Sequence, residues 1–306
     1  MENRTFFDEV FLNKLERLAL LSRRAAVGQL QGERRSSKRG YSVEFADFRP
    51  YVPGDDFRRI DWNAYARLER FFIKLFVEEE DLTVHFLLDV SQSMDWGQPN
   101  KLQFSTRAAG AIAYVALVGL DRVTLNTWPI RASNYQNQLN PIRGKRNAVK
   151  LFSFLQAVAS EPLLSTRPDP AAWLNAYAAN ARFPGPLLLF SDLMHDAWKT
   201  GLNGLAARGF EITILHVLSP DELDPESHAD PPLNGDYKLR DIETDREIEI
   251  TADFSTLEHY RRHLADWRES WRLFCRARNI HYVPVVSSLS IEDLLFTWLR
   301  RQGVLR

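Results

Sequence analysis

Two short apolar runs that each end in a carboxylate constrain the fold of this chain more than any other feature. Residues 84–88 read Val-His-Phe-Leu-Leu and lead into Asp89, and residues 186–190 read Pro-Leu-Leu-Leu-Phe and lead into Ser191 and Asp192. Apolar runs of this length are typical of parallel strands that helices cover on both faces. Ligands of open α/β sheets bind beyond the carboxyl ends of such strands, so both carboxylates are expected in one crevice.

Helical and extended patterns alternate through the rest of the chain, which predicts a doubly wound, mostly parallel sheet of the Rossmann type. Helices are expected at 101–120, 147–159, 170–181, 197–208, 257–271 and 291–299, and strands at 82–88, 122–128, 186–190, 211–218 and 280–286. Residues 221–251 interrupt the alternation and indicate an inserted β-ribbon. We therefore predict an α/β domain over 82–306. The segment 1–81 before it is expected to hold a helix (8–27), a basic linker (23–39) and a β segment with a strand at 71–77.

Composition and charge exclude several classes of protein. The 306 residues include a single cysteine, which rules out an internal disulfide and a cysteine-based zinc cluster. The formal net charge of −1 favours neither nucleic acid nor an anionic membrane as a partner. The first residues lack the pattern of a signal peptide, and the longest uncharged stretch, 108–120, falls short of the ~20 apolar residues of a membrane span. We expect a cytoplasmic protein.

The side chains at the two strand ends are oxygen donors of one chemical kind. Asp89, Ser91 and Ser93 form a D-x-S-x-S pattern, and Asp192 supplies a second carboxylate. Such hard donors suit Mg²⁺ or Mn²⁺ rather than zinc or copper, and a divalent ion would remove the repulsion between the two carboxylates. The alternative is an Asx-type turn, in which Asp89 only closes the loop after its strand.

A resemblance to a known family covers most of the chain from about residue 28 onward. It is carried by the segment from Glu44 to Trp62 (EFADFRPYVPGDDFRRIDW), by Ala66-Arg67, and by residues 89–94 (DVSQSM). These motifs resemble domain-of-unknown-function family 58, bacterial proteins with a von Willebrand factor A-like domain that are often encoded beside a MoxR-type AAA+ ATPase. In von Willebrand A domains the D-x-S-x-S motif binds a metal ion through which one protein grips a carboxylate on another.

The resemblance implies a non-enzymatic protein-interaction module with a metal site at Asp89, Ser91, Ser93 and Asp192, working with a MoxR-type ATPase or its client protein. The chain departs from the family pattern in one loop, where Pro168 stands in place of the usual ligand threonine. Ser165, Thr166, Asp169 or a water molecule could substitute there, since Mg²⁺ commonly keeps several waters. The expected cost is weaker affinity, or a site that is vacant after purification.

Two enzymatic alternatives remain open at the level of sequence. A hydrolase could use Ser91 or Ser93 with His195 and either Asp192 or Asp196, although the G-x-S-x-G elbow of such enzymes is missing. A nucleotide-using enzyme would need a phosphate loop, of which residues 144–147 (GKRN) are only a fragment.

The segments before residue 82 have structural interpretations as well. For residues 44–62 we expect a structural role, packing against the α/β domain rather than forming a catalytic pocket, with the aromatic side chains in a core. Arg49, Arg58 or Arg59 is expected to pair with one of Asp47, Asp55, Asp56 and Asp61. The basic stretch at 23–39 is either a phosphate-binding arm or a solvated linker.

Overall fold

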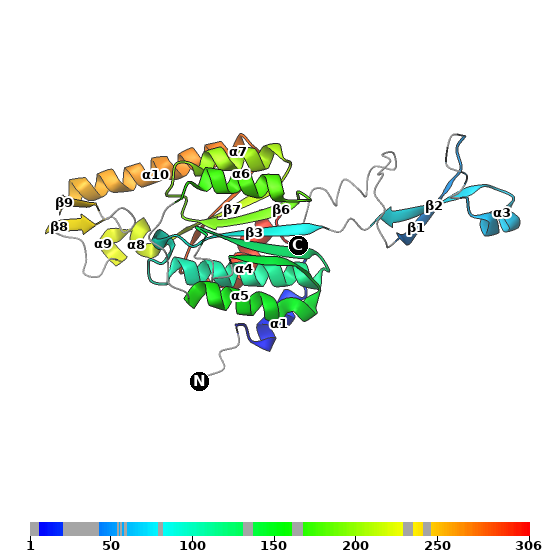
Figure 1. Ribbon diagram of the computed structural model, residues 1–306, viewed down its shortest axis with the longest axis horizontal. Helices are drawn as coiled ribbons and strands as arrows, with labels where there is room; N and C mark the ends of the chain where they lie inside the picture. The colour runs from blue at the N-terminus through cyan, green and yellow to red at the C-terminus, as the bar shows by residue number, and fades with distance from the viewer. Residues whose placement is uncertain are drawn as a thin grey trace. The chain divides into compact units, whose positions relative to one another are not determined.

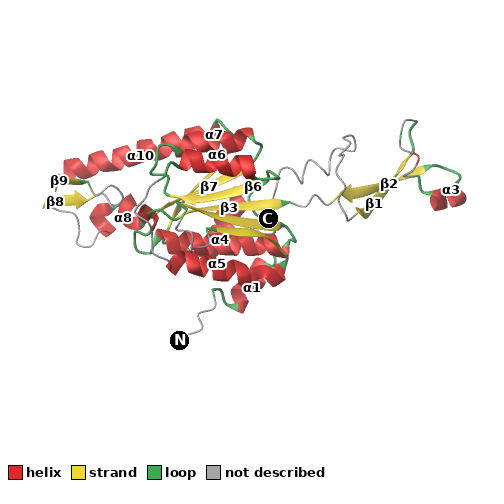
Figure 2. Cartoon of the chain, in the orientation of Figure 1, coloured by secondary structure: helices red, strands yellow, loops and turns green. Residues whose placement is uncertain are grey.

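The chain divides into two compact units, residues 1–22 with 82–306 and residues 23–81. The computed structural model describes residues 6–20, 43–53, 55, 57, 60–78, 82–130, 137–160, 168–228, 235–240 and 246–306 (Figures 1 and 2). The basic stretch 23–39 lies outside these residues.

The larger unit is built on a six-stranded sheet. Its strands are β3 (Thr83–Asp89), β4 (Arg122–Trp128), β5 (Gln138–Arg143), β6 (Pro186–Ser191), β7 (Glu211–Leu218) and β10 (His281–Val286). They lie in the order β10-β7-β6-β3-β4-β5, and all pairs are parallel except β4 with β5. Counted along the chain this is the doubly wound order 3-2-1-4-5-6, in which the direction of winding reverses between β3 and β6. The predicted fold class is confirmed.

Helices cover both faces of the sheet. On one face lie α4 (Lys101–Val118) and α5 (Ala148–Ser160), and on the other lie α6 (Pro170–Asn180), α7 (Trp198–Ala207) and α10 (Phe254–Arg276) (Figure 1). Two apolar cores fill the layers, and every residue of β6 is buried, as expected for a strand covered on both faces. Within the described part of the chain, no helix is long and apolar enough to cross a membrane.

The N-terminal helix belongs to the larger unit and is shorter than its periodicity predicts. Helix α1 spans Glu9–Leu15, and Leu15 and Leu18 are buried in the core beside α4. The chain then turns, and Leu20 forms an antiparallel bridge with Leu305 near the C-terminus. The prediction that this helix continues toward residue 27 is therefore wrong for residues 16–20. Pairing with the C-terminal residues takes the backbone out of helical geometry there.

Two other elements differ from the sequence prediction. Strand β5 is not among the elements predicted from the sequence. It contains Pro141, and as an edge strand antiparallel to β4 it tolerates the missing N–H. The ribbon at 221–251 is present as β8 (Gly235–Arg240) paired with β9 (Glu247–Ala252), but two short helices precede it. These are α8 (Pro220–Leu223) and α9 (Pro225–His228). The C-terminal segment consists of α11 (Ile291–Asp293) and a π-helical turn (Leu294–Leu299).

The smaller unit is a β-hairpin with an inserted helix. Strand β1 (Val43–Pro50) pairs antiparallel with β2 (Phe72–Glu78), and α3 (Trp62–Leu68) lies between them in sequence. Of the predicted charge pairs, Arg49 with Asp55 is confirmed as a bidentate contact at 2.7 and 2.6 Å. Phe57 and Trp62 are 65% and 60% exposed, so this unit by itself does not enclose them in a core. The large side chains of this short hairpin exceed what its small interior can cover.

Candidate functional site

The carboxyl ends of β3 and β6 meet where the winding of the sheet reverses. Asp89 ends β3, Ser191 ends β6, and Asp192 follows. The hydroxyl of Ser191 donates a 2.6 Å hydrogen bond to Asp89 Oδ2, and both carboxylates are 1% exposed. The structure therefore brings the two sequence-predicted aspartates to one buried position, the usual place for a ligand in a doubly wound sheet.

The loop after β3 adds two hydroxyls to this position. Its Ser91 backbone N–H donates to Asp89 Oδ1 at 2.9 Å, which is the Asx-type turn considered as an alternative to a metal site. The same turn places Ser91 Oγ 3.1 Å from Ser93 Oγ, and both serines are buried. The Asx-type turn and a ligand site are therefore compatible, because the turn brings the hydroxyls of Ser91 and Ser93 close together.

A buried lysine that the sequence analysis missed completes the cluster. Lys101 is 0% exposed, and its ammonium lies 3.0 Å from Asp192 Oδ2 and 2.5 Å from Glu222 Oε1 in α8. It is the first residue of α4, directly after the N-cap Asn100. A cation at a helix N-terminus is unfavourable by ~0.3–1 kcal/mol, because it is repelled by the positive end of the helix dipole. The position of Lys101 at the start of α4 was therefore the available sequence signal that carboxylates lie nearby.

The electrostatics of the cluster follow from burial and mutual repulsion. Burial, with the charge of Asp192 added, raises the pKa of Asp89 to about 7, although hydrogen bonds from Ser191 and Ser91 act in the opposite direction. Burial lowers the pKa of Lys101, but the charges of Asp192 and Glu222 outweigh this and leave it raised. Burial also raises the pKa of Glu222 against the influence of Lys101. Asp192 and Glu222 share the Lys101 ammonium, and Asp89 adds a third carboxylate, so the cluster carries a formal excess of two negative charges when all three are ionised.

His216 of β7 supports the second aspartate from the neighbouring strand. Its Nε2 is 3.0 Å from the backbone oxygen of Asp192, and its Nδ1 is 2.6 Å from the Tyr282 hydroxyl of β10. Burial lowers the pKa of His216 to about 3, so the ring is neutral at physiological pH and donates one N–H. It holds the backbone of Asp192 in place without adding charge to the cluster.

Of the residues proposed for the third ligand loop, the structure describes Pro168 and Asp169. Pro168 is exposed, and Asp169 is also exposed and caps α6 by accepting a 2.8 Å hydrogen bond from Ala171 N–H. Ser165 and Thr166 lie outside the described residues. Asp169 is therefore accounted for by a local structural role.

His195, the base of the hydrolase alternative, hydrogen-bonds to the backbone of its own loop. Its Nδ1 accepts a 3.1 Å hydrogen bond from Ala197 N–H, and its ring packs edge-on against Trp128. The two candidate nucleophiles, Ser91 and Ser93, hydrogen-bond each other. Among the described contacts, the two hydroxyls pair with each other, and His195 Nδ1 is engaged by Ala197 N–H.

The spacing of the hydroxyls fits a small divalent cation. Mg²⁺ holds oxygens at ~2.0–2.1 Å, so two neighbouring ligands of its octahedron lie roughly 2.9 Å apart. The 3.1 Å separation of Ser91 Oγ and Ser93 Oγ is close to this, and the excess negative charge of the cluster matches a divalent ion. Asp192 is the second carboxylate at this position, and its Oδ2 already accepts a hydrogen bond from Lys101, while its Oδ1 accepts one from Met194 N–H.

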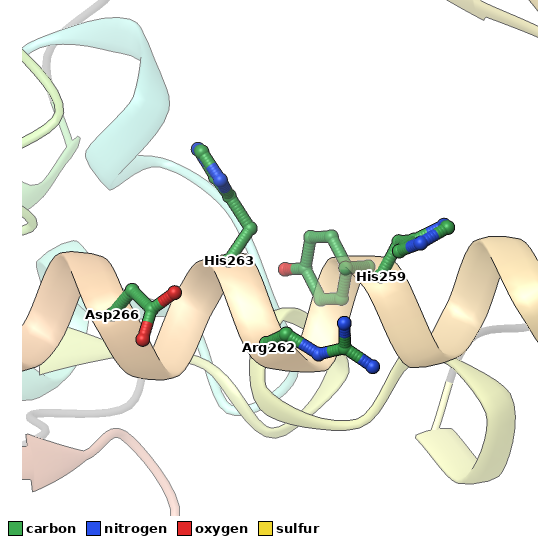
Figure 3. A pocket seen from close by; sticks show the side chains of 5 residues that line it. His259, Arg262, His263 and Asp266 are labelled. Carbon is green, nitrogen blue, oxygen red and sulfur yellow. The ribbon is translucent and has the colours of Figure 1, made fainter.

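A separate hollow lies along α10. It is lined by His259, Tyr260, Arg262, His263 and Asp266, which all come from this one helix (Figure 3). In Figure 3 the labelled side chains extend in different directions instead of meeting at one point. Among the described residues, no group of three or more His, Cys, Asp or Glu side chains is placed to hold a metal ion, at this hollow or elsewhere.

The order of the strands and the switch point between β3 and β6 define a doubly wound α/β protein. The family model "Protein of unknown function DUF58" matches residues 47–270, more than half of the chain, and the chain belongs to this family. It is similar to the uncharacterized proteins Rv1480 of Mycobacterium tuberculosis and Mb1516 of Mycobacterium bovis. Each is 26% identical over 301 residues that span 95% of this chain and 90% of the relative. Among solved structures, a conserved hypothetical protein BatB from Bacteroides thetaiotaomicron matches with 13% identity and a TM-score of 0.40, over 72% of this chain and 98% of its own.

Proposed function

We propose that this protein is a non-enzymatic interaction module that binds an acidic side chain of another protein at the switch point of its sheet. The observation that carries the proposal is the buried cluster of Asp89, Ser91, Ser93 and Asp192 at the ends of two neighbouring strands. These groups can hold a cation but offer no activated nucleophile. A cation with an open coordination position attracts a carboxylate, and the acidic residues of protein surfaces supply that group.

The cation is proposed to be Mg²⁺ or Mn²⁺. Ser91 and Ser93 would be direct ligands through their hydroxyls, Asp89 would orient them through the Asx-type turn, and Asp192 would supply the second carboxylate. Bound there, the ion would supply a positive charge that a partner's carboxylate can reach. It would also hold Asp89 in its ionised form.

The proposed partner is a MoxR-type AAA+ ATPase or the client that such an ATPase remodels, and the resemblance described above supports this choice. ATP chemistry would then belong to the partner, and the present chain would supply recognition. We expect the module to work in the cytoplasm, where such an ATPase finds ATP.

Calorimetry on chelator-stripped protein tests the metal site. Wild type should bind one equivalent of Mn²⁺ or Mg²⁺, and Asp89→Ala should abolish this binding. The matched control is Asp266→Ala, which removes an exposed carboxylate of α10 and should bind the ion as wild type does. Equal binding by wild type and Asp89→Ala would refute the assignment.

A capture experiment tests the docking role. Tagged wild type, Asp89→Ala and Asp266→Ala are incubated with the MoxR-type ATPase of the same host, with and without EDTA. Wild type should retain the ATPase only without chelator, and Asp89→Ala should not retain it at all. Undiminished capture by Asp89→Ala in EDTA would overturn the metal-bridged interaction. Turnover of ester or phosphoester substrates that disappears in Ser91→Ala or Ser93→Ala would instead support the hydrolase alternative.

A further inference from the structure

Lys101 already supplies a positive charge to Asp192, one of the proposed ligands of the metal site. Its ammonium lies on Asp192 at 3.0 Å and is shielded from solvent by the protein on every side, at 0% exposure. Any ion that takes Asp192 as a ligand must share this carboxylate with a positive charge or displace it. At such a distance in a buried position, repulsion between two cations is strong, so displacement is favoured over sharing.

The second partner of Lys101 belongs to a different element of the fold. Glu222 lies in α8, and its two carboxylate oxygens have separate roles: Oε1 accepts from Lys101 at 2.5 Å, and Oε2 accepts from Ser219 N–H at 2.8 Å. Glu222 therefore ties α8 to the crevice through Lys101. Loss of this contact would leave the segment without its buried ionic attachment.

The segment 219–223 is held beside the D-x-S-x-S loop by contacts from both sides. From that loop, Trp96 Nε1 donates to Asp221 Oδ2 at 2.6 Å. Gly97 approaches so closely that a Cβ there would lie 2.2 Å from Ser219 Cβ. From α10, the Tyr260 hydroxyl donates to the backbone oxygen of Glu222 at 2.5 Å. The segment closes over the side of the crevice that carries Lys101.

This closed arrangement leaves a polar atom unsatisfied. Within the described residues, Asp221 Oδ1 is buried and has no hydrogen-bond partner, whereas the Ser219 side chain belongs to the capping box of α8. A buried polar atom without a partner costs free energy that contact with water would recover. The cost of this buried atom opposes closure of the segment, and the Lys101–Glu222 contact is one of the interactions that keep it closed.

We propose that Lys101 and a divalent cation are alternative counter-ions of Asp192, and that binding of the ion releases Lys101 together with Glu222 and the segment 219–223. The inference rests on the proposed metal site and adds a mechanism to it. In the metal-free state Lys101 neutralises Asp192, and Glu222 occupies the position beside the cation that a partner's carboxylate would need. In the metal-bound state that position opens, so the ion prepares the site for an acidic side chain of the partner.

Calorimetry with Mn²⁺ on chelator-stripped, full-length protein tests the competition. Lys101→Met removes the competing charge and should bind Mn²⁺ at least about tenfold more tightly than wild type. The matched control is Lys199→Met, a partly buried lysine over the Trp271 ring on α10, which should leave the affinity unchanged. If wild type and Lys101→Met bind Mn²⁺ with equal affinity and Asp89→Ala does not bind it, the exchange is overturned and the metal site is retained. Absence of Mn²⁺ binding in every variant would overturn the metal site and the exchange with it.

Hydrogen exchange on the wild-type protein tests the release without relying on a destabilised variant. The amides of Leu223 and Asp224 donate to Ser219 and Pro220 in the closed segment. Saturating Mg²⁺ should quicken their exchange in wild type and leave it unchanged in Asp89→Ala. If calorimetry shows that Mg²⁺ binds while these two amides keep or gain protection, the segment is not released and the proposal is wrong.

Discussion

Replacing Lys101 by methionine is the most informative perturbation of stability in this protein. Methionine keeps the length and the apolar stem of the side chain but removes the only ammonium that the structure shows on Asp192 and Glu222. The side chains of Lys101 and Asp192 are 0% and 2% exposed, and that of Glu222 is 14% exposed, so water cannot take over as the counter-ion.

The expected loss follows from this burial. Breaking a buried ion pair from one side costs ~3–5 kcal/mol, because the remaining charge is left uncompensated. With a shift of ~2–4 °C per kcal/mol for chains of 150–250 residues, the melting temperature should fall by at least about 6 °C. Urea unfolding in EDTA, followed by tryptophan fluorescence, measures the loss without stabilisation by adventitious metal.

Two comparisons decide whether the ion pair is the cause. Adding Asp192→Asn and Glu222→Gln to Lys101→Met removes the stranded charges and should recover most of the lost stability. Lys199→Met, which removes a partly buried lysine elsewhere, should cost no more than about 1 kcal/mol. If Lys101→Met unfolds within about 1 kcal/mol of wild type, the reasoning on the buried cluster is refuted.

Three further changes have defined outcomes. Burial lowers the pKa of His85 from 6.5 to about 4, so the unfolded chain binds a proton that the folded ring excludes. Its stabilising contribution is complete above pH 6.5 and falls by about 3 kcal/mol toward pH 4, and the difference between wild type and His85→Gln in urea unfolding across this range should reveal it. Gly185→Ala would place a Cβ 2.3 Å from the backbone oxygen of Thr83 and should cost about 1–3 kcal/mol by thermal unfolding; an unchanged melting temperature would contradict this contact. Asp61 caps α3 by accepting from Asn63 and Ala64, so Asp61→Ala should lower helicity and stability by at least ~1 kcal/mol, whereas Asp61→Asn should retain most of both.

The cluster at the switch point was only half predictable. Asp89 and Asp192 could be placed because each follows a buried strand, and parallel strands in one sheet end at the same edge. Lys101 and Glu222 lie 121 positions apart, and no local pattern relates them. Their pairing depends on where α8 lies after β7, which is a result of tertiary packing.

The sequence by itself determined five of the six strands of the sheet, the helices on its two faces and the position of the inserted ribbon, because apolar periodicity reports which faces of each element are buried. Only the tertiary structure decided where α1 ends, that residues around Pro141 form an edge strand, and that Phe57 and Trp62 are exposed. It also decided that a lysine neutralises Asp192. Periodicity is a property of each segment alone, whereas strand pairing at an edge and charge pairing in a crevice depend on which distant segments meet.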